Sequence, residues 1–222
     1  MAIDFSFHRL QRLKNLGFMP KTILDIGAQK AHWAAPVHEI WPDADIYLVE
    51  ANRDHEAYLK SLSWATGFKI ALLGDKKRQK VKYYASTNPD TGGNSIFKEQ
   101  TSYFDNCETR LMPITTLDSI AKAWSLPKID LIKIDTQGSE LNIIMGGEKT
   151  IKSAEFIILE LQNLEYNLAA PDAAIVMNEM KKRGFTLFDI TQIHYLPNGD
   201  MVQFDAVFVK NNSRFLRMGK LW

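Results

Sequence analysis

The chain has 222 residues, of which 27 are Lys or Arg and 26 are Asp or Glu, so its formal net charge at pH 7 is +1. This balance gives no global attraction to nucleic acid or to an anionic membrane, and no nucleic-acid partner is expected. The one cysteine, Cys107, excludes an intrachain disulfide and fits a reducing compartment. No apolar run reaches membrane-spanning length and no signal-peptide pattern is present, which predicts a cytoplasmic protein without stable membrane insertion.

A chain of this length is most simply one domain, covering residues 1–222. Apolar residues recur at helical spacing before Gly17, which predicts an amphipathic N-terminal helix within residues 1–20. The tail, residues 211–222, mixes basic and aromatic side chains and is expected to be a packed or frayed terminus. The sequence does not indicate an oligomeric state.

A short apolar run from Thr22 to Ile26 is followed by Gly27 and then by a helix-like stretch from Lys30 to Ile40. The run predicts a buried strand of a parallel sheet. Strand, tight turn and helix together form the entry to a nucleotide-type site, because the backbone of the turn approaches the ligand and the helix N-terminus faces it. Asp and Gly are also common in ordinary turns, so that alternative stays open.

The rest of the chain continues the alternation of strands and helices. Further strands are predicted at residues 45–50, 68–73, 129–135, 156–161, 185–190 and 203–209. Helices are predicted at residues 53–64, 115–124, 139–145 and 173–183. A hairpin signal at residues 197–200 joins the last two strands. This order predicts an α/β fold whose sheet is doubly wound, mostly parallel and seven-stranded, with a C-terminal antiparallel hairpin.

Two segments stand outside this alternation. Residues 81–85 are rich in β-forming residues and predict an added antiparallel strand. The polar stretch from Thr87 to Glu99, which contains Gly92 and Gly93, predicts a long loop. Long loops in compact domains often serve as lids or binding loops, so a binding role is expected here.

Ligands of such sheets bind at the carboxyl ends of the strands, and these ends carry mostly ionisable residues. In chain order they are Asp25, Glu50, Leu72, Asp135, Glu160 and, past the sixth strand, His194. An acidic residue at the end of the second strand, roughly 20 residues after the glycine turn, is placed to accept both ribose hydroxyls of a nucleoside. A solvated glutamate at a strand end is the alternative for Glu50.

The glycine pattern distinguishes between nucleoside ligands. In register with G-x-G-x-x-G, Gln29 and His32 stand where a dinucleotide site has glycines, which counts against NAD. S-adenosylmethionine has a ribose but no phosphate, so it makes a weaker demand for glycine. An NAD-dependent oxidoreductase and a non-catalytic nucleoside-binding protein remain as alternatives.

From about Ile23 to Lys210 the chain resembles the FkbM-type S-adenosylmethionine-dependent methyltransferases. The order and spacing of six segments carry this resemblance together. The segments are Leu24-Asp25-Ile26-Gly27-Ala28, Leu48-Val49-Glu50-Ala51-Asn52, Gly92-Gly93-Asn94-Ser95-Ile96, Ile114-Thr115-Thr116-Leu117-Asp118, the stretch from Ile129 to Glu140, and Phe204-Asp205-Ala206-Val207-Phe208. The stretch from Ile129 to Glu140 is the most specific of them.

The resemblance implies a Rossmann-like methyltransferase fold and transfer of a methyl group, usually to a hydroxyl oxygen of a small molecule, sugar or lipid. It implies that Gly27 and Ala28 line the methionine end of S-adenosylmethionine, Glu50 the ribose and Leu72 the adenine side. Asp135 is expected beside the methyl group and the acceptor. The full set of expected cofactor-binding residues is Asp25, Gly27, Ala28, Gln29, Glu50, Ala51, Asn52 and Leu72.

One position departs from the family pattern. Where the family usually has Asn-x-Gly, this chain has Gln29, Lys30 and Ala31. A β-carbon at residue 31 either crowds the cofactor or requires a different path of the loop.

A hydroxyl acceptor must lose its proton, which requires a base or a metal ion. Asp135 is the first candidate for the base, followed by His194 and then Glu160. Each has a structural alternative, since Asp135 could orient the helix at Gly138, His194 could lie on the hairpin surface, and Glu160 could pair with Lys133. An Asp135 and Glu160 pair could also hold Mg²⁺, although nothing in the sequence requires a metal.

Overall fold

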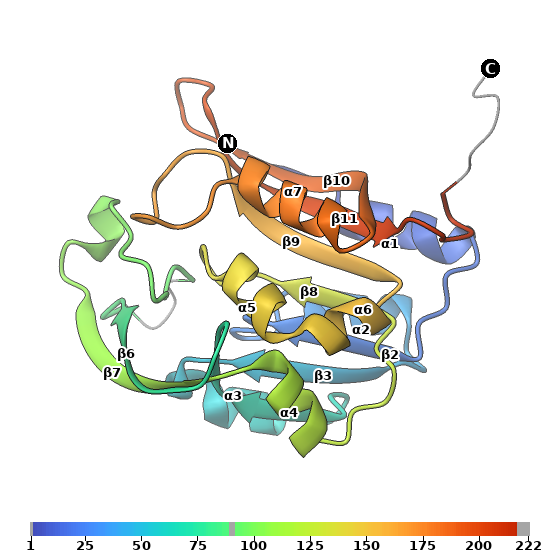
Figure 1. The fold of residues 1–222 in the computed structure, drawn as a ribbon, viewed down its shortest axis with the longest axis horizontal. Coiled ribbons are helices and arrows are strands. Elements are labelled where there is room, and N and C mark those ends of the chain that lie inside the picture. Colours follow the sequence, from blue (N-terminus) through green and yellow to red (C-terminus); the bar gives the residue numbers. More distant parts are fainter. Residues whose placement is uncertain (1, 89–91, 217–222) are drawn as a thin grey trace.

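A computed structural model describes residues 2–88 and 92–216 of the chain (Figure 1). Its strands are β1 (Ala2–Asp4), β2 (Thr22–Ile26), β3 (Asp45–Glu50), β4 (Gly67–Ile70), β5 (Leu72–Leu73), β6 (Arg78–Ala85), β7 (Glu108–Thr115), β8 (Leu131–Ile134), β9 (Phe156–Gln162), β10 (Phe185–Tyr195) and β11 (Met201–Lys210). Eight strands form the main sheet, in the order β1-β10-β11-β9-β8-β2-β3-β4, and a second sheet has the order β5-β7-β6.

Seven of the eight strands of the main sheet form the predicted sheet. Strands β9, β8, β2, β3 and β4 are mutually parallel, β11 is antiparallel to β9, and β10 and β11 form the C-terminal hairpin. The predicted α/β fold, with a doubly wound and mostly parallel sheet, is therefore confirmed. The eighth strand, β1, was not predicted and adds antiparallel to the outer edge of β10.

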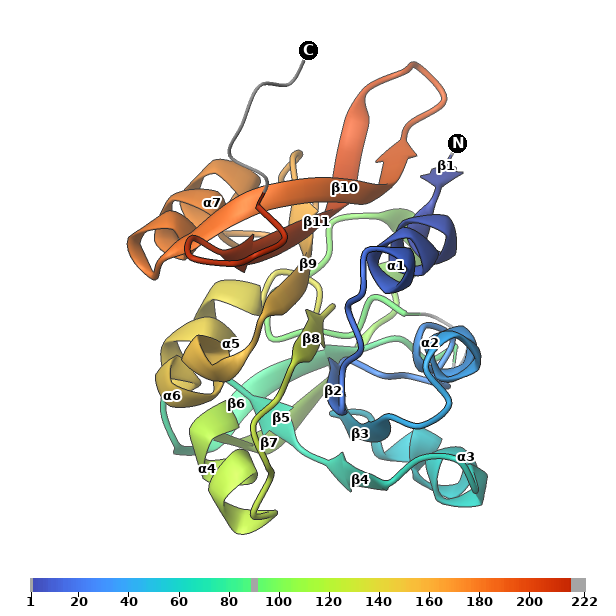
Figure 2. The ribbon, with the colours of Figure 1, turned by 90° about the vertical axis from the view of Figure 1, so that its right-hand side faces the viewer.

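Helices cover both faces of the main sheet. The α-helices are α1 (Ser6–Asn15), α2 (Ala34–Ile40), α3 (Glu56–Ser61), α4 (Leu117–Ala123), α5 (Glu140–Gly146), α6 (Glu148–Ser153) and α7 (Ala173–Lys182), with short 3₁₀ turns η1 (Arg53–His55) and η2 (Ser102–Phe104). Figure 2 shows α4 to α7 on one face of the sheet and α1 to α3 on the other. This is the doubly wound arrangement that the alternation of strands and helices predicts.

The two faces of the sheet hold two apolar cores, because successive residues of a strand point to opposite sides. In β2, Leu24 and Ile26 belong to the core beneath α4 to α7, whereas Ile23 belongs to the core beneath α1 to α3. All five residues of β2 are buried. The central strands are thus covered by apolar packing on both faces, and their carboxyl ends are where polar side chains collect.

The predicted strand at 68–73 breaks at Ala71 and serves two sheets. Its first part, β4, pairs with β3 in the main sheet, and its last two residues, β5, pair parallel with β7 in the second sheet. The predicted strand at 81–85 is the end of β6, which pairs antiparallel with β7. Strand β7 was not predicted, and it contains Pro113, a residue that is unusual inside a sheet. The second sheet lies beyond the carboxyl ends of the main strands, at the left of Figure 1.

Three predicted boundaries differ from the structure. The helix predicted from Lys30 begins only at Ala34, because Gln29 and Ala31 adopt left-handed backbone angles (φ 47° and 55°) that a right-handed helix does not allow. The helix predicted at 53–64 divides into η1 and α3. Strand β10 extends to Tyr195, five residues beyond its predicted end at Ile190.

The ends of the described chain pack on the main body. Gly17 ends the N-terminal helix region with φ +86°, as predicted. In the tail, Phe215 contacts the rings of Phe18 and Phe156 at centroid distances of 5.7 and 5.3 Å. The predicted tail also includes residues 217–222, which lie outside the described residues. Over the described ranges, none of the helices combines the length and apolar character that crossing a bilayer requires.

Close packing at Gly146 yields a test of the fold. A β-carbon at Gly146 would lie 2.0 Å from the carbonyl oxygen of Gly74. In an open helix Gly→Ala raises stability, but here we expect Gly146→Ala to lower the free energy of unfolding by about 1–3 kcal/mol through overpacking. The matched control is Gly67→Ala, whose β-carbon would meet nothing closer than 3.6 Å. Denaturant unfolding should give opposite signs, and a gain in both variants would contradict the packing.

Candidate active site

Three adjoining cavities lie at the carboxyl edge of the main sheet. The central cavity, of about 160 Å³, is lined by residues that include Gly27, Glu50, Leu72, Asp135 and Gln137. The hairpin-side cavity, of about 600 Å³, lies against the β10–β11 hairpin and shares Gly92 and Gln137 with the central one. The N-terminal cavity, of about 250 Å³, is lined by Asp4, Ser6, Phe7, Asp25, Ala28 and Lys133, and shares Gly27, Gln29 and Asp135 with the central cavity.

The structure brings most of the predicted site residues to these cavities. The central cavity is lined by Gly27, Gln29, Glu50, Ala51, Leu72 and Asp135, and the N-terminal cavity by Asp25 and Ala28. Asn52 lines none of the three cavities. Its side chain accepts a hydrogen bond from the backbone N–H of Asp54 (3.1 Å) and begins η1. The position of Asn52 is therefore explained by the turn after β3.

His194 also lines none of the three cavities. It was expected past the end of the sixth strand, but β10 is longer than predicted and His194 lies within it. There it pairs with Gln203 of β11 on one side and with Ala2 of β1 on the other. The register of the hairpin, which the sequence does not specify, thus places His194 outside the linings of the three cavities.

The turn after β2 has no room for a side chain at Gly27. This glycine has φ +85°, and a β-carbon on it would lie 1.7 Å from the carbonyl oxygen of Asp135. The backbone N–H groups of Gly27 and Ala28 both donate to the carbonyl oxygen of Val49, at 2.9 and 3.1 Å. The predicted tight turn therefore holds the ends of β2, β3 and β8 together beside the central cavity.

Glu50 joins the end of β3 to the turn after β2. Its carboxylate accepts the backbone N–H of Gln29 at 2.8 Å and that of Asn52 at 2.7 Å, and the residue is 7% exposed. Burial raises the pKa of Glu50, and the two backbone donors act in the opposite direction. Because each carboxylate oxygen has further lone pairs, Glu50 can accept two additional hydrogen bonds from a molecule in the central cavity.

The methyl group of Ala31 points away from the cavities. Ala31 is 1% exposed, belongs to the apolar core beneath α1 to α3 and lines none of the three cavities. This packing of Ala31 favours a different path of the loop over crowding of the cofactor. The left-handed backbone at Ala31 costs roughly 1–2 kcal/mol relative to a right-handed conformation.

The predicted binding loop lies between two of the cavities. Gly92 lines both the central and the hairpin-side cavity, and Asn94, Ser95 and Ile96 line the central one. Ser95 fastens the loop to the turn after β8, because its Oγ donates to the carbonyl oxygen of Gln137 at 2.7 Å. Residues 89–91 of the predicted loop lie outside the described residues.

Two buried side chains of the central cavity were missed in the sequence. His55 of η1 is 3% exposed and Tyr83 of β6 is 2% exposed, and both line the cavity. Burial, reinforced by the nearby Glu50 carboxylate, raises the pKa of Tyr83. Tyr83 lies in the predicted strand at 81–85, where alternation gives a weak signal. His55 has no signal, since its position depends on how η1 packs.

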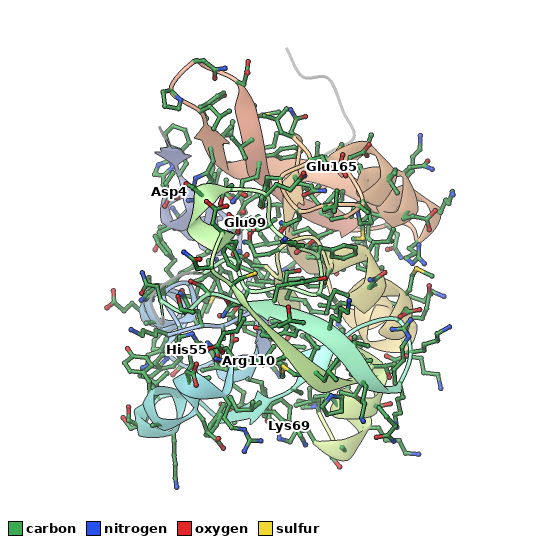
Figure 3. All side chains as sticks on the ribbon, turned by 90° about the vertical axis from the view of Figure 1, so that its left-hand side faces the viewer. Asp4, His55, Lys69, Glu99, Arg110 and Glu165 are labelled. Atoms are coloured by element: carbon green, nitrogen blue, oxygen red, sulfur yellow. The ribbon has the colours of Figure 1, made fainter. Side chains whose placement is uncertain are left out.

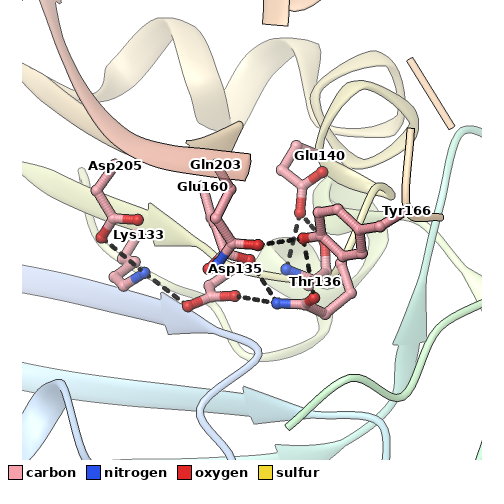
Figure 4. A network of polar contacts seen from close by, with 9 residues as sticks. Lys133, Asp135, Thr136, Glu140, Glu160, Tyr166, Gln203 and Asp205 are labelled. Carbon is pink, nitrogen blue, oxygen red and sulfur yellow. Dashed lines mark hydrogen bonds and ion pairs between the residues drawn. The ribbon is translucent and has the colours of Figure 1, made fainter. Parts of the chain in front are cut away.

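A buried lysine organises the polar side chains next to the cavities (Figure 4). Lys133 of β8 is 3% exposed, and its Nζ lies 2.9 Å from Oδ2 of Asp135 and 3.4 Å from Oδ2 of Asp205. Pairing of Lys133 with Glu160, one alternative that the sequence left open, gives way to these two ion pairs. Glu160 instead accepts hydrogen bonds from the side-chain amides of Gln137 and Gln203.

Gln137 connects this network to the central and hairpin-side cavities. It has a left-handed backbone (φ 55°), and its Nε2 donates to Oδ1 of Asp135 at 3.2 Å and also to Glu160. Its Oε1 accepts from the hydroxyl of Tyr166 at 3.2 Å, and that hydroxyl also bonds to Gln203. A non-glycine residue in this conformation is strained, and such strain is concentrated at functional sites.

The pKa values of Asp135 and Glu160 are shifted in opposite directions. Burial would raise the pKa of Asp135, but the Lys133 ammonium and several hydrogen bonds hold it below its usual value. For Glu160, burial and then the carboxylates of Asp135 and Asp205 raise the pKa well above the usual range. Of the two carboxyl groups, Asp135 therefore ionises more readily and Glu160 holds its proton more strongly.

Asp25 is a buried carboxyl with an unused oxygen in the N-terminal cavity. It is 1% exposed, and its Oδ2 has no hydrogen-bond partner among the described residues. Burial raises its pKa to about 7, although the charge of Lys133 opposes the shift. Buried polar atoms are nearly always hydrogen-bonded, so an unused one at a cavity marks a position for a donor.

No metal-binding arrangement is found in the described part of the chain. Neither in residues 2–88 nor in residues 92–216 do three or more His, Cys, Asp or Glu side chains converge as metal ligands would. The pair of Asp135 and Glu160 that could have held Mg²⁺ is engaged by Lys133 and the glutamine amides.

The doubly wound sheet, with its cavities at the carboxyl edge, has the Rossmann-like methyltransferase fold. Residues 25–187 match the model of the FkbM methyltransferase domain, and the chain belongs to this family, as the resemblance predicted. Curated protein sequences contain no match.

Solved structures are similar in fold. TrmK of M. capricolum, in complex with S-adenosylhomocysteine, has a TM-score of 0.53 and 11% sequence identity, covering 94% of this chain and 69% of that chain. Precorrin-6y C5,15-methyltransferase of Geobacter metallireducens has a TM-score of 0.49 and 14% identity, covering 91% and 87%. At these identities the similarity concerns the fold alone.

The buried carboxyl of Asp25 makes stability depend on pH. Its pKa is raised from 3.8 to about 7, so the folded state retains a proton that the unfolded state loses as the pH rises between these values. Unfolding is then favoured by up to about 1.4 kcal/mol for each pH unit. Asp25→Asn removes this loss, and denaturant unfolding from pH 4 to 8 should show a variant whose stability gains on the wild type with rising pH. Parallel curves would contradict the raised pKa.

Proposed function

We propose that this protein is an S-adenosylmethionine-dependent methyltransferase that methylates a hydroxyl oxygen. The observation that carries the proposal is the set of side chains at the central and N-terminal cavities of a chain that belongs to the FkbM methyltransferase family. Membership of this family, together with Gln29 and His32 in place of glycines, counts against the alternative of an NAD-dependent oxidoreductase.

The residues present fit S-adenosylmethionine. The unused Oδ2 of buried Asp25 suits the ammonium group of the methionine part, and Gly27 and Ala28 provide a turn without side-chain bulk beside it. Glu50 has free lone pairs for the ribose hydroxyls. Leu72, with Leu73 and Ile143, provides an apolar wall for the adenine. When bound there, S-adenosylmethionine would supply an electrophilic methyl group.

The chain's own residues then have to orient the acceptor and take its proton. Asp135 lines the central cavity as a charged carboxylate, and Gln137 lies where the central and hairpin-side cavities meet. An acceptor hydroxyl donating to Asp135 would pass its proton to the coupled pair of Asp135 and Glu160. The low pKa of Asp135 alone makes it a weak base, whereas ionisation of Glu160 beside it makes the pair more basic.

Cofactor binding tests the role of Glu50. Calorimetric titration of the wild type should show binding of S-adenosylmethionine and S-adenosylhomocysteine and none of NAD. Glu50→Ala should weaken S-adenosylmethionine binding by about 1.5–3 kcal/mol, the usual worth of hydrogen bonds to a charged group. Since Glu50 also holds two backbone N–H groups, Glu50→Gln is the matched variant that keeps an acceptor for the turn. Unchanged affinity in the folded Ala variant would remove Glu50 from the site.

Turnover tests the role of Asp135. Asp135→Asn should lower the rate roughly 10²–10⁴-fold, as loss of a general base does, while cofactor affinity changes little. Asp205→Asn is the matched control, because Asp205 also pairs with Lys133 but lines none of the cavities. Equal losses of turnover in both variants would assign Asp135 a structural role.

The pH profile of the turnover rate distinguishes a base formed by Asp135 and Glu160 together from Asp135 acting alone. The rate should rise with pH as the pair loses its shared proton, and Glu160→Gln should move this rise to lower pH, because the raised pKa belongs to Glu160. Loss of activity with EDTA that Mg²⁺ restores would instead favour a metal-assisted reaction at Asp135.

A further inference from the structure

We infer that the hairpin-side cavity binds the methyl acceptor, and that it takes a neutral or cationic headgroup rich in hydroxyls and rejects an anionic one. This inference rests on the proposed methyl transfer, because it assigns the second substrate of the same site. The sequence left hydroxyls of small molecules, sugars and lipids open as acceptors, and the inference adds a selection by charge to that choice.

The cavity has the position and the size that an acceptor requires. It shares Gly92 and Gln137 with the central cavity, so a molecule in it meets the contents of the central cavity at these two residues. Its volume of about 600 Å³ lies within the usual range for small-molecule sites. The central cavity is much smaller, at about 160 Å³.

The polar lining suits hydroxyl groups. The cavity is lined by the side chains of Gln100, Gln137, Gln203 and Tyr166. Gln100 and Gln203 each use one amide N–H within the protein and keep a second one, while the amide oxygens and the Tyr166 hydroxyl oxygen keep lone pairs that can accept. A sugar-like ring, whose hydroxyls both donate and accept, can satisfy such a mixed set. One wall, formed by Leu164, Leu196 and Val202, is apolar and suits the less polar part of the same molecule.

The charges of the lining are of one sign. Glu99 and Glu165 contribute carboxylates, and none of the lining residues that the structure describes is Lys, Arg or His. Glu99 is 9% exposed, and its carboxylate accepts a hydrogen bond from Thr101, not from a cation. Burial raises the pKa of Glu99, as expected of a carboxyl without a compensating positive charge.

Four charged side chains labelled in Figure 3 lie in two groups on this side of the molecule. In Figure 3, Glu99 and Glu165 lie toward the end of the molecule with the β10–β11 hairpin, whereas Lys69 and Arg110 lie toward the opposite end. Arg110 is engaged there by Asp54 and Glu108. A phosphate or carboxylate in the hairpin-side cavity would therefore meet two carboxylates, and like charges held close in a partly buried site repel.

Binding of three matched glycosides tests the inference without requiring turnover. The probes are methyl β-D-glucopyranoside, its 2-amino-2-deoxy analogue and methyl β-D-glucuronide, which are neutral, cationic and anionic at pH 7. Each is titrated by NMR into the protein saturated with S-adenosylhomocysteine, whose own binding is first measured by calorimetry. We expect the neutral and amino glycosides to bind at least tenfold more tightly than the glucuronide.

Charge-neutral variants show whether the glutamates cause the selection. Glu99→Gln and Glu165→Gln, alone and together, should reduce the discrimination against the glucuronide to less than threefold in the double variant. Glu108→Gln, which removes an exposed carboxylate outside the cavity, should leave it unchanged. If Glu99→Gln does not fold, Glu165→Gln carries the test, since Glu165 is exposed.

The outcomes separate the two proposals. Equal or tighter binding of the glucuronide, no binding of the neutral and amino glycosides, or unchanged discrimination in the variants would each overturn the inference. Each of these results leaves the proposed methyl transfer intact as long as S-adenosylhomocysteine binds. Failure of S-adenosylhomocysteine to bind would overturn the proposed function itself.

Discussion

The ammonium group of Lys133 is the interaction on which both the sheet and the site depend. A lysine buried in the middle of a parallel sheet is tolerated only when carboxylates compensate its charge, and here Asp135 and Asp205 do so from the end of β8 and from β11. The charge of Lys133 also acts to lower the pKa of Asp25, which lies on the adjacent strand β2. Acidic residues from three strands therefore lie around the lysine at one edge of the sheet, next to the cavities.

This arrangement places more carboxyl groups in the interior than one lysine can neutralise. Asp25, Glu50, Glu160 and Asp205 all have raised pKa values, for which burial is the largest cause. Such a cluster lowers the stability of the protein without a ligand, and active sites commonly carry this kind of cost. A positively charged ligand at the carboxyl edge would relieve it, which gives the site a preference for cations before any specific contact is considered.

The sheet and its carboxyl edge could be predicted because both depend on local pattern. Apolar runs predict buried strands, and the residues that follow them, such as Asp25, Glu50 and Asp135, must then meet at one edge. The misses depend on contacts between distant segments. Strand β7 is stabilised by β6 despite Pro113, and the register of the β10–β11 hairpin decides where His194 lies. The hydrogen bonds that join Gln137 to Glu160 and Tyr166 connect three segments of the chain, and the sequence of no single segment predicts them.

Gly92 and Gln137 form a wall that the central and hairpin-side cavities have in common. The hydroxyl of Ser95, which lies in the same loop as Gly92, donates a hydrogen bond to the carbonyl oxygen of Gln137 and so joins the two sides of this wall. A molecule that orders this wall from one side changes the affinity on the other side, and thermodynamic reciprocity makes the two changes equal. If both cavities bind substrates as proposed, the hydrogen bond between Ser95 and Gln137 is one contact through which their binding equilibria would be linked. The apparent affinity for one substrate would then depend on how much of the other is present.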